Sequence, residues 1–384
     1  MQSTDTFAPF MTIAVNTRFL LNDYLEGYGY FTYETFQHII KNHQEHQFIF
    51  IFDRKYDERF VFGPNVTPIV AGPAARHPLL WKFWYDVRVP AVLRKYKAEV
   101  FVSCDGFCSL TSKVPQCLVV HDLAFLHHPS FIKRTQLNFY KKYTPKFLAR
   151  ARGIATVSEF SKKDILTHYK IDPQKIDVVF SAAKEIFEPL TDEIRREVKN
   201  KYTEDKEYFV YAGAIHPRKN LMNLLKAFSV FKKRQQTNMK LLLAGRLAWK
   251  YGSFTESLKT YKYRDDVVLT GYVPEAELVN IIGAAYGMLY PSLFEGFGVP
   301  VLEAMQCEIP VITSANSSMS EIAGEAALYA DANDHTDIAE KMMLLYKDER
   351  LRKELITKGS KTALQYNWER TADLLWQCIM KAAG

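Results

Sequence analysis

Cysteine is scarce in this sequence, and the spacing of the few cysteines excludes two common kinds of site. The 384 residues contain five of them, an odd number with no CxxC pair. A disulfide framework and a cysteine zinc site both need a different pattern. We therefore expect all five to be reduced residues of the core or of loops, including Cys104 and Cys108 in the segment CDGFC.

Long apolar runs are missing as well. No stretch reaches the roughly 18 uninterrupted apolar residues that argue for a membrane-spanning helix. The first residues, MQSTDTFAPFMTIAV, lack the basic segment and the apolar segment of a secretory leader. We therefore predict a chain of the cytoplasm and expect no helix that crosses a bilayer.

Acidic residues are sparse in the first half of the chain. Residues 1–184 have a net formal charge of +8, whereas residues 185–384 have −1. Within the first half, residues 76–152 hold 14 Lys and Arg against 4 Asp and Glu. Four aromatic residues stand among them: Trp81, Phe83, Trp84 and Tyr85. Such a segment suits an anionic partner, either the inner face of an anionic membrane or an anionic acceptor. It fits equally a solvated helical face whose aromatic side chains point into the core.

Short β-rich runs alternate with longer helical patterns along the whole chain, which is typical of parallel sheets with crossover helices. The strands predicted in the first half cover residues 12–15, 48–52, 99–103, 117–121, 153–158 and 176–180. Those predicted in the second half cover residues 208–214, 240–245, 267–273, 287–292, 310–314 and 327–331. A charged stretch between Ser181 and Lys206 separates the two series.

This pattern predicts two doubly wound, Rossmann-like α/β domains that face each other across a cleft. We assign residues 1–184 to the first domain and 185–367 to the second, and we expect a closing helix over about 368–384 that packs back on the first. In such folds ligands bind beyond the carboxyl ends of the strands, so the cleft between the domains is the expected site.

The segment PSLFEGFGVPVLEAM, residues 291–305, follows one of the predicted strands. Pro300 stands where a first helical turn would begin, and Gly296 and Gly298 let the backbone approach a ligand closely. A helix from about residue 300 would direct its free N–H groups and the positive end of its dipole at a phosphate.

Two acids flank this loop, and we expect both to bind hydroxyl groups of a sugar nucleotide. Glu295 lies at the strand end, and we place Glu303 in the first helical turn. Taken alone, an acid in a first turn is equally consistent with a residue that only favours the helix dipole.

At this point the sequence resembles a known family. EGFGVPVLEAM is similar to the EX7E motif of the retaining glycosyltransferases of family 4, the glycosyl transferases group 1, which have the GT-B fold. The likeness is almost continuous over residues 278–342 and covers nearly the whole chain. It implies that Glu295 contacts the transferred sugar and Glu303 the nucleotide ribose. It further implies that the loop contacts sugar and phosphate through Gly296, Phe297, Gly298 and Val299.

The segment YAGAIHPRKN puts Arg218 and Lys219 just before a helix that we expect to begin near Asn220. Two cations there could neutralise a departing diphosphate, although a basic loop in solvent has the same pattern. The family motif has Gly-Arg, four residues and then Lys, so the resemblance implies that Gly213 and Lys219 contact the donor. Because Ala214 stands where the family has arginine, we assign that charge to Arg218.

Three further segments are assigned by the resemblance. His121, at the end of a strand in VVHD, would lie beside the donor sugar, although a structural histidine fits there too. Gly27 and Gly29 resemble the first glycine loop of the family, close to the diphosphate or the acceptor. Tyr272 and Val273 would contact the base. No third glycine and no following acid completes a nicotinamide fingerprint.

Two remaining features have a weaker pattern. Ser158 and Ser161 in TVSEFSKKDI are predicted helix caps, and a serine motif lines the cleft in the family. Arg246, after LLLAG, could approach the nucleotide.

The function expected from these observations is transfer of a hexose from a nucleotide diphosphate donor to an acceptor hydroxyl, with retention and without a metal or other cofactor. We prefer mannose, and hence GDP-mannose over UDP-sugars, because HPRKN together with the loop resembles the mannosyltransferase branch. The expected acceptor is a glycan or lipid-linked saccharide in polysaccharide synthesis, with peripheral association at an anionic membrane and no nucleic acid. An epimerase or phosphorylase of the same architecture and a non-catalytic sugar-binding protein are the alternatives.

Overall fold

The strands form two parallel sheets, as the alternating pattern predicts. The computed structural model describes residues 10–22, 25, 27–246 and 252–384. The first sheet has seven strands in the order β3-β2-β1-β4-β5-β6-β7. They are β1 (Thr12–Asn16), β2 (Gln47–Phe52), β3 (Val66–Val70), β4 (Val100–Ser103), β5 (Gln116–Val120), β6 (Gly153–Thr156) and β7 (Ile176–Val178).

The second sheet has six strands in the order β10-β9-β8-β11-β12-β13. They are β8 (Tyr208–Ala212), β9 (Lys240–Ala244), β10 (Val267–Gly271), β11 (Gly287–Tyr290), β12 (Val311–Ser314) and β13 (Ala327–Ala330). The strand order reverses between β1 and β4 in the first sheet and between β8 and β11 in the second. These are the switch points of doubly wound folds, where ligands bind.

All twelve strands expected from the sequence are present, and one was missed. β3 contains Pro68, and a proline within a short run argues against a strand because it removes a ladder donor. The structure places β3 at the edge of its sheet, where one side of the strand needs no partner and proline is tolerated.

Helices cover both faces of the first sheet. They are α1 (Gly27–Asn42), α2 (Pro78–Phe83), α3 (Val89–Lys95), α4 (Ala124–His127), α5 (Arg134–Arg150) and α6 (Glu159–His168), with a π-helical turn at Trp84–Arg88 joining α2 to α3. The strand residues alternate, so that Ile13 and Val15 face one core and Ala14 the other. Both faces of this sheet are therefore buried, as expected for a parallel sheet.

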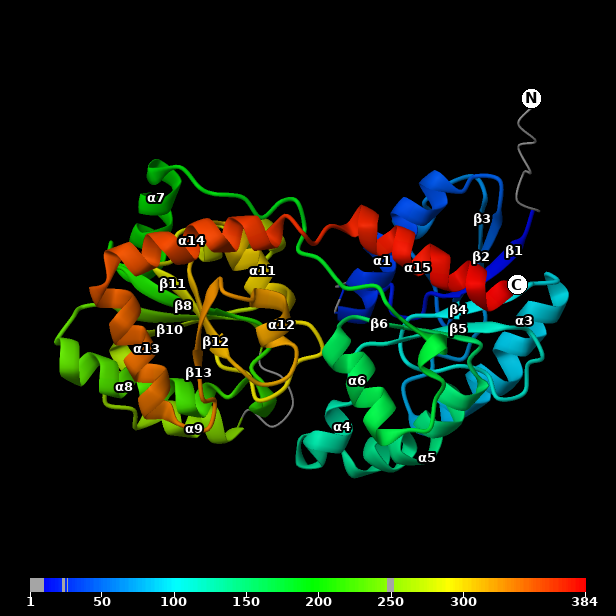
Figure 1. The fold of residues 1–384 in the computed structure, drawn as a ribbon, viewed down its shortest axis with the longest axis horizontal. Coiled ribbons are helices and arrows are strands. Elements are labelled where there is room, and N and C mark those ends of the chain that lie inside the picture. The colour runs from blue at the N-terminus through cyan, green and yellow to red at the C-terminus, as the bar shows by residue number, and fades with distance from the viewer. Residues whose placement is uncertain (1–9, 23–24, 26, 247–251) are drawn as a thin grey trace.

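The second sheet lies between two further helical layers (Figure 1). Its helices are α7 (Asp192–Thr203), α8 (Leu221–Gln235), α9 (Gly252–Lys259), α10 (Glu275–Gly283), α11 (Val299–Gln306), α12 (Met319–Ala323), α13 (His335–Lys347) and α14 (Glu349–Ala363). α8 packs on α13, and α11 packs on α14. A short 3-10 turn, Pro217–Lys219, precedes α8.

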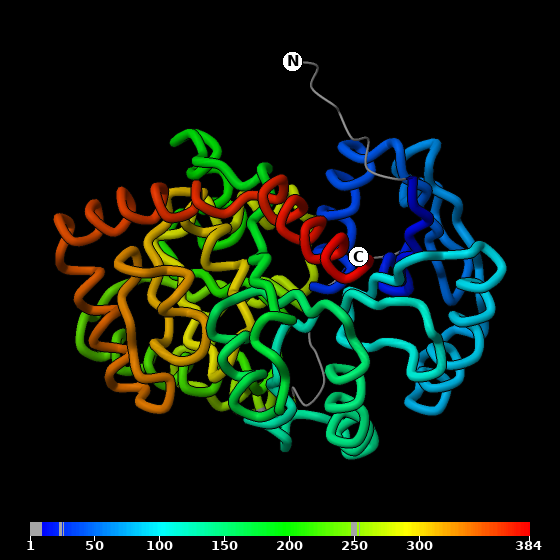
Figure 2. Tube along the Cα trace, turned by 45° about the vertical axis from the view of Figure 1, so that its right-hand side comes forward, coloured from blue at the N-terminus to red at the C-terminus, as the bar shows by residue number. Residues whose placement is uncertain are grey.

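The last helix, α15 (Trp368–Ala383), returns to the first domain. Figure 2 shows it running back over the first domain, where it packs against α1 and across the strands from β4 to β7. Its inner face includes Leu375 and Ile379, both fully buried. The chain therefore crosses between the two domains twice, once before α7 and once before α15.

We predict that Ile379→Ala destabilises the protein by about 2–5 kcal/mol, because it leaves a cavity where α15 packs on the first sheet. The melting temperature, measured by calorimetry, should fall accordingly. Leu364→Ala is the matched control, since Leu364 is 80% exposed. Equal melting temperatures for the two variants would contradict the packing of α15 described here.

Candidate active site in the interdomain cleft

A cavity of about 780 Å³ lies between the two domains. Its wall combines the carboxyl ends of strands from both sheets, so residues that follow β5, β8, β9, β10 and β11 meet in one place. Most of the site residues predicted from the sequence line it: Gly27, His121, Gly213, Arg218, Lys219, Tyr272, Val273, Glu295, Gly296, Phe297, Gly298 and Val299. Arg246 lines it too, whereas Gly29 and Glu303 are not part of this wall.

Four charged side chains form a cluster in the cleft. The Lys219 Nζ donates a hydrogen bond of 2.6 Å to the carboxylate of Glu295, which is 6% exposed. The Arg218 Nη1 lies 3.3 Å from the carboxylate of Asp122, and its Nη2 lies 3.9 Å from Glu295. Asp122 belongs to the first domain and the other three to the second, so the cluster spans the cleft. With two cations and two anions, its formal charge is zero.

These pairings set the protonation of Glu295. Burial alone would raise the pKa of this carboxyl, but Lys219 and Arg218 outweigh burial and lower the pKa to about 2. Burial lowers the pKa of Lys219, and Glu295 opposes that shift. Both groups are therefore charged together, because either one alone would be an unpaired buried charge.

The loop after β11 presents unused donors. α11 begins at Val299 with Pro300 in its first turn, and Gly298 caps it at a φ of 106°. Within the described part of the chain, no hydrogen bond uses the backbone N–H groups of Phe297, Gly298 or Val299. Amides at a helix start that face a cavity bind phosphate or sugar oxygens well.

Gly296 is required by its contact with the first domain. A Cβ on this residue would lie 2.3 Å from the carbonyl oxygen of His121. The carbonyl of Gly296 accepts hydrogen bonds of 2.7 Å from Ser158 Oγ and 3.3 Å from Ser161 Oγ. Ser158 also caps α6, as expected, whereas Ser161 is the third residue of this helix and donates its backbone N–H to Ser158 Oγ. The loop that carries Glu295 is thus fixed against the opposite domain.

Glu321 makes a second connection between the domains. It lies on α12, and its two carboxylate oxygens accept hydrogen bonds of 2.8 Å from the backbone N–H groups of Glu159 and Phe160. Those amides open α6 and have no partner within their own helix. A carboxylate from one domain therefore satisfies the helix start of the other.

His121 is held as a neutral ring. Its Nε2 lies 3.0 Å from the carbonyl oxygen of Cys104, and because a carbonyl can only accept, Nε2 has the proton. Burial lowers the pKa of this imidazole. The ring contacts Tyr28 at 4.8 Å between centroids. Its Nδ1 is then an acceptor, suited to a hydroxyl donor.

Glu303 differs from expectation in position and charge. It is the fifth residue of α11, and no acid lies in the first turn, so our placement in that turn was wrong: the helix begins one residue before Pro300. Burial and the nearby carboxylate of Glu275 raise its pKa to about 8, with Lys184 opposing. At neutral pH and without a ligand, the side chain is a carboxylic acid that can donate as well as accept a hydrogen bond.

A second cavity, of about 880 Å³, adjoins the first and is lined mostly by the first domain, with His216 and Arg218 from the second. The two share five residues of their walls: Phe19, Tyr28, His121, Asp122 and Arg218. The wall of this N-terminal cavity is rich in aromatic rings and arginine, including Trp81, Phe107 and Tyr140 with Arg18, Arg54 and Arg76. Sequence reasoning did not find it, because these residues are scattered along the chain.

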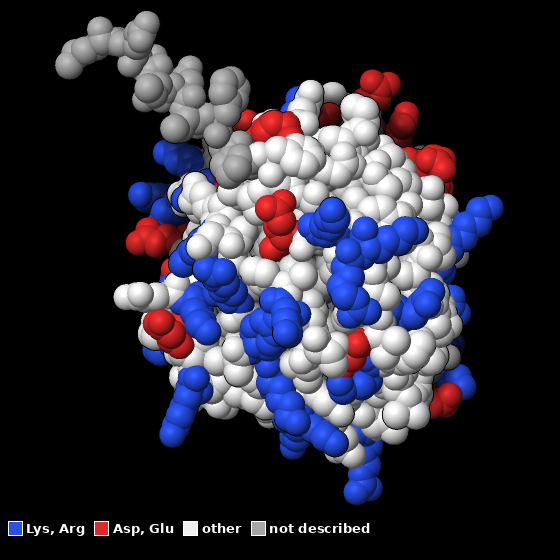
Figure 3. All heavy atoms as spheres, turned by 90° about the vertical axis from the view of Figure 1, so that its right-hand side faces the viewer, with Lys and Arg blue, Asp and Glu red and all other residues white. Residues whose placement is uncertain are grey.

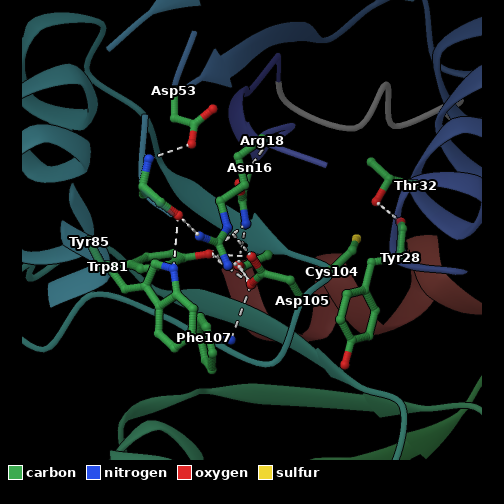
Figure 4. A network of polar contacts seen from close by, with 12 residues as sticks. Asn16, Arg18, Tyr28, Thr32, Asp53, Trp81, Tyr85, Cys104, Asp105 and Phe107 are labelled. Carbon is green, nitrogen blue, oxygen red and sulfur yellow. Dashed lines mark hydrogen bonds and ion pairs between the residues drawn. The ribbon is translucent and has the colours of Figure 1, made fainter. Parts of the chain in front are cut away.

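Arg18 lines the N-terminal cavity, and Figure 4 shows the polar contacts that hold it. Its Nε donates a 2.6 Å hydrogen bond to Asp105, and its Nη1 donates to the carbonyl of Ala75. The Tyr85 hydroxyl donates to the same carboxylate at 2.7 Å. The rings of Phe19 and Phe107 lie within 4.6 and 5.5 Å of the guanidinium carbon. The network holds one buried arginine in a fixed orientation.

Two groups of side chains in the described residues are close enough to share a cation: His43, Glu45 and His46, and His127, Asp164 and His168. Neither group lines the two cavities. Asp164 already accepts a 2.9 Å hydrogen bond from His127.

The comparisons with known proteins agree with this architecture. Residues 27–182 match the family model described as Glycosyltransferase Family 4, and residues 192–362 match the model described as Glycosyl transferases group 1. The chain is 28% identical over 299 residues to the O-antigen chain mannosyltransferase B of Escherichia coli, covering 77% of this chain and 78% of that protein.

Two solved structures share the fold over almost the full length of both chains. The sucrose-phosphate synthase from Thermosynechococcus elongatus superimposes with a TM-score of 0.78 at 17% identity, covering 96% of this chain and 98% of that one. Anabaena Alr3699/HepE in complex with UDP-glucose does so with a TM-score of 0.73 at 13% identity, covering 96% and 98%. The predicted GT-B fold is confirmed.

We predict that the stability of the protein falls as the pH rises from about 5 to 8 because of Glu303. The unfolded chain releases this proton near the ordinary pKa of 4.5, whereas the folded chain keeps it up to about 8. The free energy of unfolding should therefore decrease over that window, by on the order of 4 kcal/mol for this group. Glu303→Gln removes the effect.

The test is the melting temperature of Glu303→Gln relative to the wild type at pH 5 and pH 8. The difference should move in favour of the variant by several degrees at the higher pH. Glu340→Gln, an exposed substitution on α13, should show no such change. A difference that stays constant with pH would contradict the raised pKa of Glu303.

Proposed function

The chain belongs to the GT-B glycosyltransferases of family 4, and from this premise we propose that it transfers mannose, with retention of configuration, from a nucleotide diphosphate sugar to a glycan hydroxyl. That it is a glycosyltransferase acting in glycan or polysaccharide synthesis follows from its family and its relatives. The retention of configuration, the identity of the sugar donor and the roles of the site residues are what we propose.

The observation that supports the proposal best is the four-charge cluster in the cleft. A diphosphate that leaves a sugar gains negative charge, and fixed cations in a site with little water stabilise that charge strongly. Arg218 and Lys219 are already held there by two carboxylates. Because these cations supply the charge, we propose that transfer needs no metal and no other cofactor.

We propose separate roles for the groups around the cluster. The free amides of residues 297–299 hold the phosphate and the sugar, and Tyr272 and Val273 contact the base. Glu295, ionised and fixed by Lys219, accepts from hydroxyls of the transferred sugar and orients it. The neutral His121 accepts from the same sugar on the side of the first domain. The departing phosphate takes the proton of the acceptor hydroxyl on its own face of the sugar.

Glu303 binds the ribose in this proposal. It is the fifth residue of α11 and is not part of the cavity wall, to which Val299 and Pro300 at the start of this helix belong. Its protonated form can donate to one ribose oxygen and accept from another hydroxyl.

GDP-mannose is the donor that we propose. The supporting observation is the O-antigen chain mannosyltransferase of Escherichia coli, which is similar over most of both chains. The HepE structure is named as a complex with UDP-glucose, which supports a nucleotide sugar in this fold and keeps a UDP-sugar as the alternative.

The acceptor binds in the N-terminal cavity, on this proposal. The cavity is large enough for a saccharide and meets the cleft at His121 and Asp122. Its aromatic rings suit the apolar faces of sugars. An epimerase needs no second substrate, so a second cavity of this size favours transfer.

We further propose a cytoplasmic chain that meets lipid-linked acceptors at an anionic inner membrane face. No helix in the described residues has the length and apolar character to span a bilayer.

Glu295→Gln should lower the rate of transfer by roughly 100-fold to 1000-fold while nucleotide affinity changes little, because the variant loses the carboxylate that orients the sugar. Rates would be measured by nucleotide release and affinities by calorimetry. Glu340→Gln should behave as the wild type. A Glu295→Gln enzyme that binds the nucleotide and transfers at the normal rate would contradict the role.

A donor should raise the melting temperature of the folded protein, since it binds only that state. Among GDP-, UDP- and ADP-sugars, we expect GDP-mannose to give the largest rise in melting temperature. At 100 times its Kd, the free energy of unfolding should increase by about 3 kcal/mol. A larger rise with a UDP-sugar would replace the proposed donor, and no rise with any of them would contradict a nucleotide-sugar site.

A further inference from the structure

The helix formed by α2, the π-helical turn and α3 has two different faces. The inner face carries three of the four aromatic residues noted in the sequence, and Trp81, Trp84 and Tyr85 are all buried. Their indole and hydroxyl groups bond inside the domain, for example Trp84 Nε1 to the carbonyl of Ala71 at 2.7 Å. These rings are therefore core residues, as expected for a solvated helical face whose aromatic side chains point into the core.

The outer face carries a row of large apolar side chains that stay partly or mostly exposed. Leu79 is 76% exposed, Phe83 is 41% exposed and Val87 is 50% exposed. A spacing of four residues puts all three on one side of the helix. We call these three residues the apolar ridge. Three large apolar side chains in one row are unusual on a free surface and indicate an interaction site.

Lysines lie on the helix that carries the ridge and on the neighbouring helix α5. The ammonium groups of Lys82, Lys142 and Lys146 lie 5.7, 5.4 and 5.6 Å from the ring centre of Tyr143 on α5. Lys82 follows Leu79 by three residues and is next to Phe83, and α2 packs on α5. Asp86 pairs with Lys82, so the other two lysines leave a net positive charge beside the ridge.

The charge extends along α5. Residues 134–150 include five Lys and Arg and no Asp or Glu. The four acids of residues 76–152 all have partners: Asp86 with Lys82, Glu99 with the backbone of Thr12, Asp105 with Arg18, and Asp122 with Arg218. Figure 3 looks at this end of the molecule, where Lys and Arg outnumber Asp and Glu on the surface.

We infer that the apolar ridge inserts into the surface of an anionic lipid bilayer while the lysines around it bind the lipid headgroups. Apolar side chains flanked by lysine are the pattern of helices that lie in the membrane interface, and each nearby cation adds attraction to anionic lipid. The charge decides between occupants, because a second copy of this chain would bring the same positive face against the first.

The inference deepens the proposed function, because the ridge adjoins the acceptor cavity. Trp81, on the inner face of the ridge helix, and Tyr140, on α5, both line the N-terminal cavity. A chain docked through the ridge would therefore hold this cavity near the membrane surface, where a lipid-linked acceptor has its saccharide.

The experiment is cosedimentation of the full chain with vesicles of phosphatidylcholine alone or mixed with phosphatidylglycerol, at low salt. The wild type should bind the mixed vesicles and should not bind vesicles of phosphatidylcholine alone. The triple variant Leu79→Ser, Phe83→Ser, Val87→Ser should bind the mixed vesicles at least 10-fold more weakly, because it loses the apolar area that would be buried. The variant Lys142→Gln, Lys146→Gln should also bind more weakly.

The matched control replaces three exposed apolar residues of the second domain, Leu269, Leu344 and Leu364, with serine, and should bind as the wild type. Because the ridge residues are exposed and line neither cavity, the ridge variant should fold normally and bind the nucleotide with unchanged affinity. Nucleotide titration without vesicles thus reports on the proposed function separately.

Three results would overturn the inference. The first is no binding of the wild type to mixed vesicles at low salt. The second is equal binding by the ridge variant and the wild type, which would leave charge alone as the cause. The third is a concentration-dependent dimer, seen by sedimentation velocity, that the ridge variant abolishes without any vesicle binding, which would make a second copy the occupant.

Discussion

The site depends on a buried ion pair between Lys219 and Glu295. Each charge alone would be costly at this depth in the cleft, and each one keeps the other ionised. Arg218 extends the pair to Asp122 in the opposite domain. The same four charges therefore connect the loop after β11 and the two cations to the first domain. In the proposed function, an incoming diphosphate would meet cations that are already oriented, and little reorganisation would be needed when charge develops on the leaving group.

The contacts between the domains explain why the site is complete only when both are present. Gly296 has no room for a side chain against His121, and its carbonyl is held by serines of α6. Glu321 satisfies the start of that helix from the other side. The residues that bind the sugar in our account are therefore positioned by bonds that cross the cleft. Any opening of the domains would break these bonds and move Glu295 away from His121.

Much of the fold was predictable because buried parallel strands appear as short apolar runs. Among the strands of the described residues, only β3, which contains Pro68, was not predicted. Glu295 and Lys219 were found because their motifs are local. Three features were not found: Asp122 as the partner of Arg218, the bonds of Glu321 to the start of α6, and Arg18 in the wall of the N-terminal cavity. Each depends on a partner far away in the sequence. Glu303 lies one position further along its helix than expected, and burial and Glu275 raise its pKa; a sequence pattern resolves neither. The apolar ridge was hidden for a similar reason: composition shows which residues a helix contains, but not which of them the domain buries.

The most direct test of the central claim is a crystal structure of the protein with the intact donor or with the nucleoside diphosphate. The account predicts the diphosphate within hydrogen-bonding distance of Arg218, Lys219 and the amides of residues 297–299, with Glu295 on the hydroxyls of the sugar. A nucleotide bound elsewhere, with the pair between Lys219 and Glu295 unchanged and no contact to either residue, would contradict it.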